Sequence, residues 1–281
     1  MVELFSIGGF SLHLFGLTIA AGIFIGISVM LREGKRKGLD TNRLTDLGVY
    51  TLIAAMIGAR LNYVIAFNPG YYLEHPLAIL MVQRGGLSIQ GGLIGGAIFA
   101  FWYMRKKEIP IWKTADAFAP GIIIGQAVGR VGCDVFGVPM ERAWIWGVEA
   151  GGQLLHPAQM YESMLNYGLF LLLWNVRKRM RYNGQLFMLY VMGFSFNRFI
   201  VEFFRTNPMV AGPFSIAHVF SLVMIGAGLI GMRWLQKSSE KTQSTVANPA
   251  NDRGTFDWKT HFIILGAMIV SVLFYYWIHG L

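Results

Sequence analysis

The sequence predicts an all-α fold: a polytopic bundle of transmembrane helices, with seven core helices and one more appended at the C-terminal end. Two observations predict it. Of the 281 residues, 54% are hydrophobic and only 14% are charged, whereas a soluble domain carries about 25% charged residues. Apolar stretches of about 20 residues, the length needed to cross a bilayer, recur along the chain. This composition excludes a disordered or fibrous chain and argues against a water-soluble enzyme.

Eight stretches are long and apolar enough to be membrane spans. In chain order they are 11–31, 44–67, 77–104, 115–132, 158–176, 185–204, 214–235 and 260–279. We expect the first to be a retained span, because neither a basic segment nor a small-residue cleavage site marks a signal peptide. The first seven predict a core domain over 1–235. The polar stretch 236–259 predicts a flexible cytoplasmic linker, and 260–281 an extra transmembrane helix.

The positive charges are unevenly distributed between the connecting loops. The net charge is +9, and 18 of the 24 Lys and Arg residues, including every lysine, fall in four loops. These loops are 32–43, 105–114, 177–184 and 233–259, which share one side of the membrane if the first helix enters from outside. The positive-inside rule makes that side cytoplasmic and puts both termini outside. Because the basic residues are divided among separated loops, a nucleic-acid-binding surface is excluded.

Six cations lie outside those loops, and all of them are arginines. They are Arg60, Arg84, Arg130, Arg142, Arg198 and Arg205. A charge inside the membrane costs at least about 2.5–3.5 kcal/mol, so such residues need a partner. A guanidinium grips carboxylate or phosphate with a planar fork. The partners are therefore either carboxylates on neighbouring helices or an anionic ligand, and six arginines in the outer half favour the ligand.

Four local patterns add detail. Arg198, Glu202 and Arg205 are spaced i, i+4, i+7 and share one helix face. Gly121, Gly125 and Gly129 predict close helix packing, and Asp116 is expected to cap a helix N-terminus or to pair with a loop lysine.

The glycine-rich stretch 85–96 suggests a broken helix at its start. Either its backbone N–H groups bind phosphate, or its glycines serve only for close helix packing. In the stretch 156–162, Gln159 and Glu162 share a face next to His156.

Taken in order, the segments of residues 11–235 resemble the prolipoprotein diacylglyceryl transferase family. The matching pieces are Leu12-His13 with Gly16, GARLNYVIAFNPGYYLEHP (58–76), GGLSIQGGLIGG (85–96), DAFAP (116–120), GRVG (129–132), HPAQMYE (156–162), RFIVEFFR (198–205) and GPFSIAHVFS (212–221). The resemblance implies a transferase in the bacterial cytoplasmic (inner) membrane, with its active site facing outward. It does not cover the eighth helix.

The implied reaction moves the diacylglyceryl group of phosphatidylglycerol to the lipobox cysteine thiol of a preprolipoprotein. A thioether forms and glycerol-1-phosphate leaves. The implied partners are phosphatidylglycerol, lipobox signal peptides and membrane lipids, with no metal or other cofactor. The implied catalytic residues are Arg130, Arg198, His156, Glu202 and Gln90. The implied phosphatidylglycerol-binding residues are Arg130, Arg198, Arg205, Arg60, Gly91, Gly92, Gln159, Tyr161, Glu162 and His13.

Three positions depart from the family pattern: Gln90, Cys133 and Phe194 stand where the family often has His, Asn and Tyr. Two alternatives therefore stay open. Beside the diacylglyceryl transferase that the resemblance implies, these are a divergent membrane lipid transferase with another acceptor and a non-catalytic lipid-binding membrane protein. If it is active, the base is His156, His13 or Glu162, or the thiol ionises beside arginine. Cys133 is either a small buried hydrophobe or a covalent carrier of the lipid.

Overall fold

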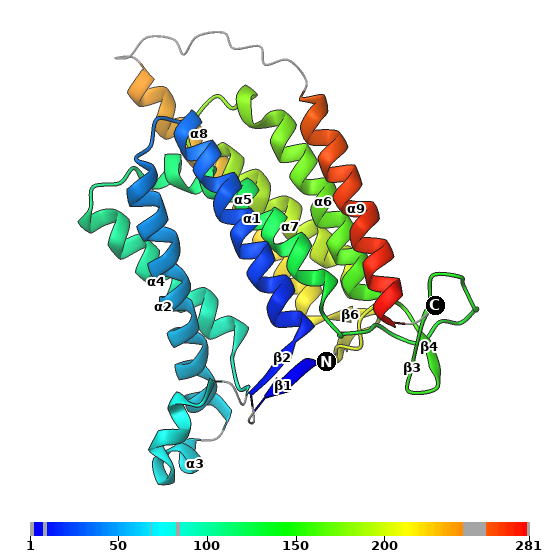
Figure 1. Ribbon diagram of the computed structural model, residues 1–281. Coiled ribbons are helices and arrows are strands. Elements are labelled where there is room, and N and C mark those ends of the chain that lie inside the picture. Colours follow the sequence, from blue (N-terminus) through cyan, green and yellow to red (C-terminus); the bar gives the residue numbers. More distant parts are fainter. Residues whose placement is uncertain (1–2, 8–9, 68, 83–84, 244–256, 280–281) are drawn as a thin grey trace. The chain divides into compact units, whose positions relative to one another are not determined.

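The computed structural model describes residues 3–7, 10–67, 69–82, 85–243 and 257–279, and most of them are helical (Figure 1). Over these residues there are eight helices of 18 residues or more, one in each predicted span. Their bounds are α1 Leu14–Arg36, α2 Thr41–Phe67, α4 Ile89–Lys106, α5 Ile111–Val131, α6 Ala158–Val176, α7 Gln185–Glu202, α8 Ile216–Gln243 and α9 Trp258–His279. The all-α prediction is confirmed.

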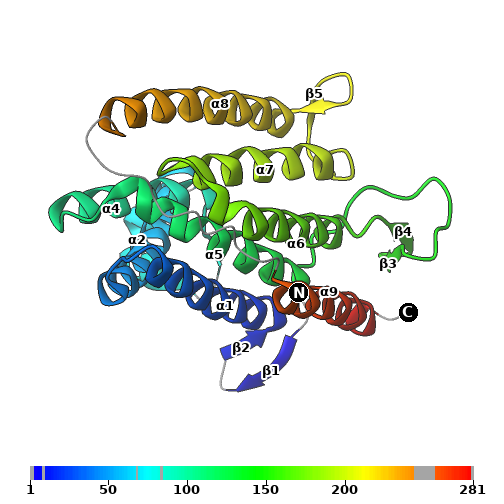
Figure 2. The same cartoon turned by 90° about the horizontal axis from the view of Figure 1, so that it is seen from above.

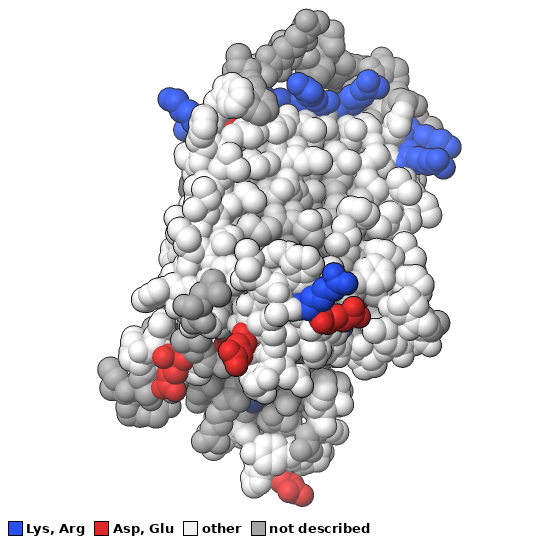
Figure 3. Space-filling model, turned by 90° about the vertical axis from the view of Figure 1, so that its right-hand side faces the viewer, with Lys and Arg blue, Asp and Glu red and all other residues white. Residues whose placement is uncertain are grey.

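Four of these helices are long and apolar enough to cross a membrane by length and composition. They are α1, α2, the Ile216–Ser239 part of α8, and α9. On the side of the molecule seen in Figure 3, a broad band without blue or red side chains separates the Lys and Arg side chains at the top from the charged side chains of both signs below it. The chain is therefore a membrane protein. The number of seven core spans stays a prediction.

The chain divides into two compact units, one formed by Met1–Met30 with Ala115–Leu281 and the other by Leu31–Thr114. In the first unit α8, α7, α6 and α9 lie side by side in that order (Figure 2). An apolar core joins α5 to α6, α7 and α9. Its fully buried members include Ala119, Ile123, Phe170, Leu173 and Leu186.

The glycine stripe of α5 packs against α1, as predicted. A Cβ on Gly121 would lie 2.5 Å from the carbonyl oxygen of Gly26, and one on Gly125 2.9 Å from that of Gly22. Only glycine allows the two backbones to come so close. Asp116, which is fully buried, caps a helix other than its own. Its carboxylate accepts the N–H groups of Gly184 and Phe187 at the start of α7, 2.9 Å each.

The second unit is built on the crossing of α2 and α4, where a Cβ on Gly58 would lie 2.5 Å from the carbonyl oxygen of Gly91. The predicted span 77–104 is corrected here. It begins with a short 3-10 helix, η1 (Pro76–Leu80), and α4 starts only at Ile89, where the Ser88 side chain caps it. Between them Gly85 and Gly86 have φ of +84° and +76°. Those left-handed angles suit glycine and interrupt the helix there.

The remaining elements are short. A six-residue helix, α3 (Pro69–Glu74), precedes η1, and a 3-10 turn, η3 (Arg177–Arg179), follows α6. Three antiparallel hairpins occur in the described parts of the chain: β1 Glu3–Ile7 with β2 Phe10–His13, β3 Val148–Ala150 with β4 Gln153–Leu155, and β5 Met209–Ala211 with β6 Phe214–Ser215. Helix α8 continues to Gln243, past the predicted linker start at 236. Residues 244–256 lie outside the described residues.

Candidate functional site

Five charged side chains gather at one end of the first unit, where α5 ends, α6 begins and α7 ends. Arg130 is on the last turn of α5, Glu162 is on the second turn of α6, and Arg198 and Glu202 close α7. Arg205 follows three residues later. The basic 3-10 turn Arg177–Arg179 is at the other end of α6. Fifteen residues of helix separate it from Glu162, about 22 Å at 1.5 Å per residue.

The five residues form an alternating chain of opposite charges. Arg130 Nη2 lies 3.0 Å from Glu162 Oε1, and the other oxygen of Glu162 lies 3.5 Å from Arg198 Nη1. Arg198 Nη2 in turn lies 3.2 Å from Glu202 Oε2, and Arg205 Nε lies 3.8 Å from that same oxygen. The predicted stripe on α7 is thus extended across two other helices, because Glu162 joins Arg198 to Arg130.

The Glu202 carboxylate is held more completely than its helix spacing alone predicts. Besides Arg198 and Arg205, its Oε1 accepts hydrogen bonds of 2.6 Å from Asn207 Nδ2 and from Ser215 Oγ. Asn207 precedes β5 and Ser215 lies in β6, so the hairpin after α7 folds back over the carboxylate. Hydrogen bonds to a charged acceptor are stronger than those between neutral groups. Glu202 therefore holds its arginines and the hairpin in place.

The cluster carries one uncompensated positive charge, because three arginines face two glutamates. The glutamate side chains are 2% and 0% exposed, whereas those of Arg130, Arg198 and Arg205 are 29%, 23% and 17% exposed. The carboxylates are therefore shielded from solvent, and the arginines are the groups of the cluster that a ligand can reach. Burial and the positive charge of the neighbouring Arg198 lower the pKa of Arg205. The arginines of the cluster therefore repel one another. A monoanionic ligand would neutralise the uncompensated positive charge.

Polar contacts between helices hold the ion-pair chain in place. Ser163 Oγ, next to Glu162, donates 2.7 Å to the carbonyl of Ala127 on α5. One turn deeper, Asn197 of α7 donates 3.1 Å to Asn166 of α6. Such hydrogen bonds average about 0.6 kcal/mol inside a membrane protein. Their value here is geometric, because they fix the spacing of the three helices that carry the charges.

His156 lies in the loop just before α6. Its backbone accepts a 2.8 Å hydrogen bond from Gly137 N and donates one to Val138 O, which anchors the loop. Its ring Nδ1 lies 3.1 Å from the Tyr161 hydroxyl, and the ring packs on Phe204, with 5.1 Å between centroids. Burial lowers the pKa of His156. At neutral pH it is therefore an uncharged imidazole. Its two partners, Tyr161 and Phe204, directly precede Glu162 and Arg205 in the chain.

Two predicted residues border the cluster in other ways. Cys133 is buried, and Arg130 Nη1 lies 3.9 Å from its sulfur. Gln159 is only 1% exposed, and its amide donates 2.6 Å to the Tyr275 hydroxyl of α9. The side chain of Gln159 is thus engaged by the C-terminal helix. A contact between Gln159 and lipid stays a prediction.

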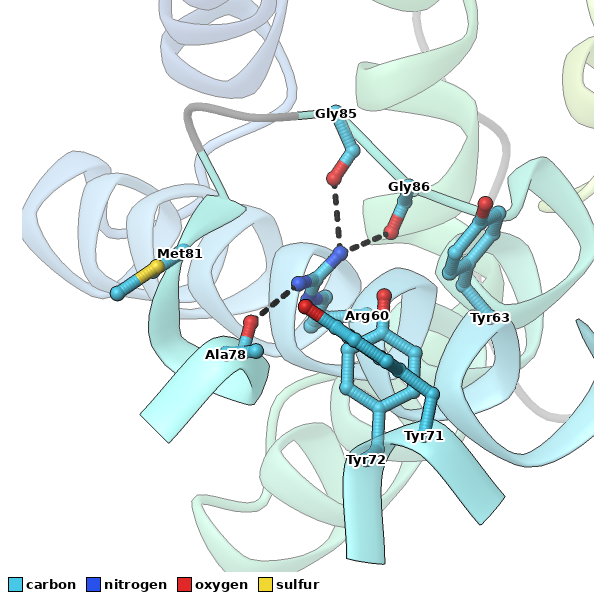
Figure 4. A pocket seen from close by; sticks show the side chains of 8 residues that line it. All are labelled: Arg60, Tyr63, Tyr71, Tyr72, Ala78, Met81, Gly85 and Gly86. Atoms are coloured by element: carbon cyan, nitrogen blue, oxygen red, sulfur yellow. Dashed lines mark hydrogen bonds between the residues drawn. The ribbon is translucent and has the colours of Figure 1, made fainter. Parts of the chain in front are cut away.

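The second unit holds Arg60, in a very different setting (Figure 4). Arg60 is 6% exposed and donates to four backbone carbonyls: Ile79 at 2.8 Å, Gly85 and Gly86 at 2.8 Å, and Ala78 at 2.6 Å. These bonds tie the turn at 76–86 to α2. The guanidinium also lies 5.3 Å from the Tyr72 ring centroid, and Tyr63 and Tyr71 line the same pocket.

The other predicted residues of this unit surround the start of α4. Gln90 is exposed, and its Oε1 accepts a 3.0 Å hydrogen bond from Ser88 Oγ. The N–H of Gly91 points to Ser88 Oγ at 3.4 Å, and the N–H of Gly92 donates 3.0 Å to Ser88 O. These amides are therefore used to start the helix, and the nearby glycines bring α2 close. Phosphate binding at Gly91 and Gly92 stays a prediction.

Three further residues complete the placement of the predicted arginines and bases. His13 ends β2, is half-buried, and directly precedes α1. Arg142 is exposed in the loop between α5 and β3. Arg84 lies outside the described residues. Over the part of the chain that the structure describes, no group of three or more His, Cys, Asp and Glu side chains is arranged to hold a metal ion.

Sequence reasoning missed Asn207 and Ser215 as partners of Glu202. Ser215 lies inside the matched segment 212–221, so it was within a recognised motif without an assigned role. Asn207 comes five residues after Glu202, beyond the end of the helix. Helical spacing carries no information about residues that return to a site through a hairpin.

Apolar helices long enough to cross a membrane, with three partly exposed arginines on two buried carboxylates at one end of the first unit, define a membrane protein with a candidate anion site. The chain belongs to the prolipoprotein diacylglyceryl transferase family, which matches residues 2–234. The match contains every residue of the cluster and ends before α9.

Three relatives give the extent of the similarity, each described as a phosphatidylglycerol–prolipoprotein diacylglyceryl transferase. The protein from Synechococcus elongatus is 34% identical over 265 residues, covering 88% of this chain and 91% of the relative. That from Clostridioides difficile is 32% identical over 242 residues, covering 85% and 97%. That from Bacillus licheniformis is 35% identical over 246 residues, covering 82% and 91%. The similarity therefore extends over most of each protein.

Proposed function

We propose that this protein transfers the diacylglyceryl group of phosphatidylglycerol to the lipobox cysteine of a preprolipoprotein. The observation that carries the proposal is the cluster of Arg130, Arg198 and Arg205. It has net charge +1 and turns its arginines toward the accessible side, as a phosphodiester monoanion requires. Family membership and the names of the relatives support the same reaction.

The proposed reaction is a displacement at carbon. The thiolate sulfur attacks the glycerol carbon of the diacylglyceryl group that carries the phosphate ester oxygen. The new C–S bond is the thioether, and the broken C–O bond releases glycerol-1-phosphate. The electron pair of the broken bond stays on the phosphate oxygen, where charge develops. Arginines already directed at the phosphate stabilise that charge without reorganising.

The thiol must lose its proton, because the thiolate is the nucleophile and a free cysteine has a pKa near 8.5. Among the predicted bases, His156 suits the task best. It is uncharged, and its ring Nδ1 lies within hydrogen-bond distance of the Tyr161 hydroxyl. Glu162 is a weaker candidate, because both oxygens of its carboxylate are already engaged, one by Arg130 and the other by Arg198.

The proposed orientation places the cluster toward the outer face of the bacterial cytoplasmic membrane. Arg177–Arg179 lies at the opposite end of α6 from Glu162, and a basic loop is expected on the cytoplasmic side. Lipobox cysteines cross to the outer face during export, so a site there meets its acceptor. The basic C-terminal part of α8, with Arg233 and Lys237, fits the same cytoplasmic assignment.

The direct test uses the purified full-length chain in phosphatidylglycerol vesicles with a synthetic lipobox peptide. We expect the peptide cysteine to gain one diacylglyceryl mass and glycerol phosphate to appear in equal amount. The chain should also restore lipoprotein lipidation in a bacterium depleted of its own enzyme. A well-folded protein that releases glycerol phosphate but leaves the peptide unmodified would indicate another acceptor. A protein that releases none would be a lipid-binding protein, and either result contradicts the proposal.

A further inference from the structure

Helix α9 lies beyond the residues that match the family, yet it is bound along α6 by a row of specific contacts (Figures 1 and 2). The two helices run antiparallel. Near the start of α9, Asp257 accepts 3.2 Å from the Trp174 indole. In its middle, the Ser271 hydroxyl lies 3.0 Å from that of Tyr167. An appended anchor held only by apolar contact would need none of these partners.

The last two turns of α9 reach three separate segments around the candidate site. Tyr275, fully buried, accepts the 2.6 Å hydrogen bond from Gln159 on the first turn of α6. Tyr276 donates 2.7 Å to the backbone carbonyl of Trp146, in the loop between α5 and β3. His279 Nε2 lies 3.6 Å from Asp134, four residues after Arg130.

Two of these contacts lead to residues proposed to act in the reaction. Gln159 is one helical turn before Glu162, the carboxylate that joins Arg130 to Arg198. The side chains of Trp146 and Tyr161 are neighbours, and the Tyr161 hydroxyl lies 3.1 Å from His156 Nδ1. The path from α9 to the imidazole is therefore Tyr276, Trp146, Tyr161, His156.

The opposite face of α9 has a different character. Its large exposed side chains are Phe262, Ile263, Leu265, Ile269, Val270, Leu273 and Trp277. An apolar face of this kind suits lipid contact. The α9 residues Ser271, Tyr275 and Tyr276 instead direct their hydroxyls to partners on α6 and in the loop before β3, because an unpaired polar group inside the bilayer would be costly.

We propose that the C-terminal end of α9 is a built-in positioning element of the transferase site, with Tyr275 and Tyr276 as positioning residues. Tyr275 holds the first turn of α6, and Tyr276 holds the 141–147 loop that backs Tyr161 and His156. Neither tyrosine touches a reacting atom. The inference rests on the proposed function. It assigns a positioning role in that reaction to a helix that lies outside the family match.

The test compares Tyr275→Phe and Tyr276→Phe with Ser271→Ala in the full chain. Each removes one hydroxyl and one hydrogen bond of α9, but Ser271 contacts α6 about one and a half turns beyond Glu162. We expect kcat for lipidation of the lipobox peptide to fall about three- to tenfold in either tyrosine variant, the effect of losing one ordinary hydrogen bond. KM for phosphatidylglycerol should change less than about twofold, because the arginines remain.

The Ser271→Ala variant should lose as much thermal stability as Tyr275→Phe and keep its kcat. If it loses kcat equally, α9 acts through general stability, and the proposal is wrong. The proposal is equally wrong if both tyrosine variants keep the kcat of the parent chain.

A second measurement does not depend on turnover. Amide hydrogen exchange of 132–138, 144–147 and 158–162 should quicken in Tyr275→Phe and Tyr276→Phe but not in Ser271→Ala. Unchanged exchange in the tyrosine variants would overturn the inference. If the parent chain fails to lipidate the peptide, the proposed function fails, and exchange alone decides whether α9 positions these segments.

Discussion

Buried arginines occur in both units of this protein, and their partners differ. In the first unit Arg130, Arg198 and Arg205 share two buried glutamates and keep part of each guanidinium accessible. In the second, Arg60 is almost fully buried and its donors all point to backbone carbonyls (Figure 4). Both arrangements satisfy a charged group that would otherwise be very costly in an apolar setting.

The comparison teaches that the kind of partner, more than the presence of an arginine, indicates function. A carbonyl carries no net charge, and Arg60 donates to four of them, which holds a turn but binds no charged partner. A carboxylate fixes one edge of a guanidinium and leaves another edge free. Three arginines on two carboxylates leave both free edges and a net positive charge, which are the requirements for binding an anion. Four experiments test whether the two groups of arginines differ in function in this way.

The largest effect is expected for Arg130→Ala. It removes the cation nearest Cys133 and leaves Glu162 with Arg198 alone. We expect turnover of phosphatidylglycerol to fall on the order of 10³-fold, at the upper end for loss of one preorganised donor. The measurement is release of glycerol phosphate. Arg142→Ala, in the exposed loop, is the matched control and should retain activity; equal losses would show that the cluster is not the site.

The next effect concerns the base. Burial holds the pKa of His156 below its ordinary value of 6.5, and the proton-accepting form exists only above that pKa. Turnover should therefore rise with pH through a midpoint below 6.5 and stay level above it. His156→Gln should lower turnover on the order of 10²-fold and abolish this acid limb. An acid limb that survives the substitution would assign the base to another group.

A smaller effect is expected for Glu202→Gln. The amide keeps the shape but not the charge that holds Arg198 and Arg205, and Ser215 and Asn207 lose a charged acceptor. We expect about a tenfold loss of kcat/KM and a lower melting temperature, because a buried ion pair has been broken. Asn207→Ala, which removes one neutral donor, is the milder comparison. A Glu202→Gln variant with wild-type activity would remove the orienting role of Glu202.

The smallest effect on turnover is expected for Arg60→Lys. One ammonium cannot reach four carbonyls in different directions, so we expect the free energy of unfolding to fall by about 1–3 kcal/mol. Turnover of the folded fraction should change less than about twofold. Thermal unfolding and KM for phosphatidylglycerol are measured together. A raised KM with unchanged stability would instead make Arg60 a lipid ligand.

Much of the fold followed from local pattern. Each of the eight apolar stretches contains a long helix, and the α5 glycines pack as their spacing predicts. The span 77–104 was wrong as one continuous helix, whereas the break suggested by the glycines at 85–86 is confirmed: η1 ends at Leu80, Gly85 and Gly86 have left-handed φ angles, and Ser88 caps α4. Apolar content reports burial or lipid contact, and it does not report backbone conformation.

The site was predictable in part for the same reason. Arg198 and Glu202 lie on α7, and Arg205 follows directly after its end, so their local spacing brought them together. Arg130 and Glu162 come from two other helices, and no local rule states that they meet. Asn207 arrives through a hairpin. Gln159 was predicted from its motif to bind lipid, which stays a prediction, and its hydrogen bond to Tyr275 of α9 could not be read from the sequence.

Length, hydropathy and charge are properties of single segments. The sequence was therefore enough to predict apolar helices, basic loops and six arginines that the positive-inside rule does not explain. Tertiary structure alone decided which arginines bind carbonyls, which share carboxylates, and which helices close around His156. Those outcomes depend on distances between segments far apart in the chain. The partner of a buried charge is set by packing, and the partner determines whether the charge is used for structure or kept for a ligand.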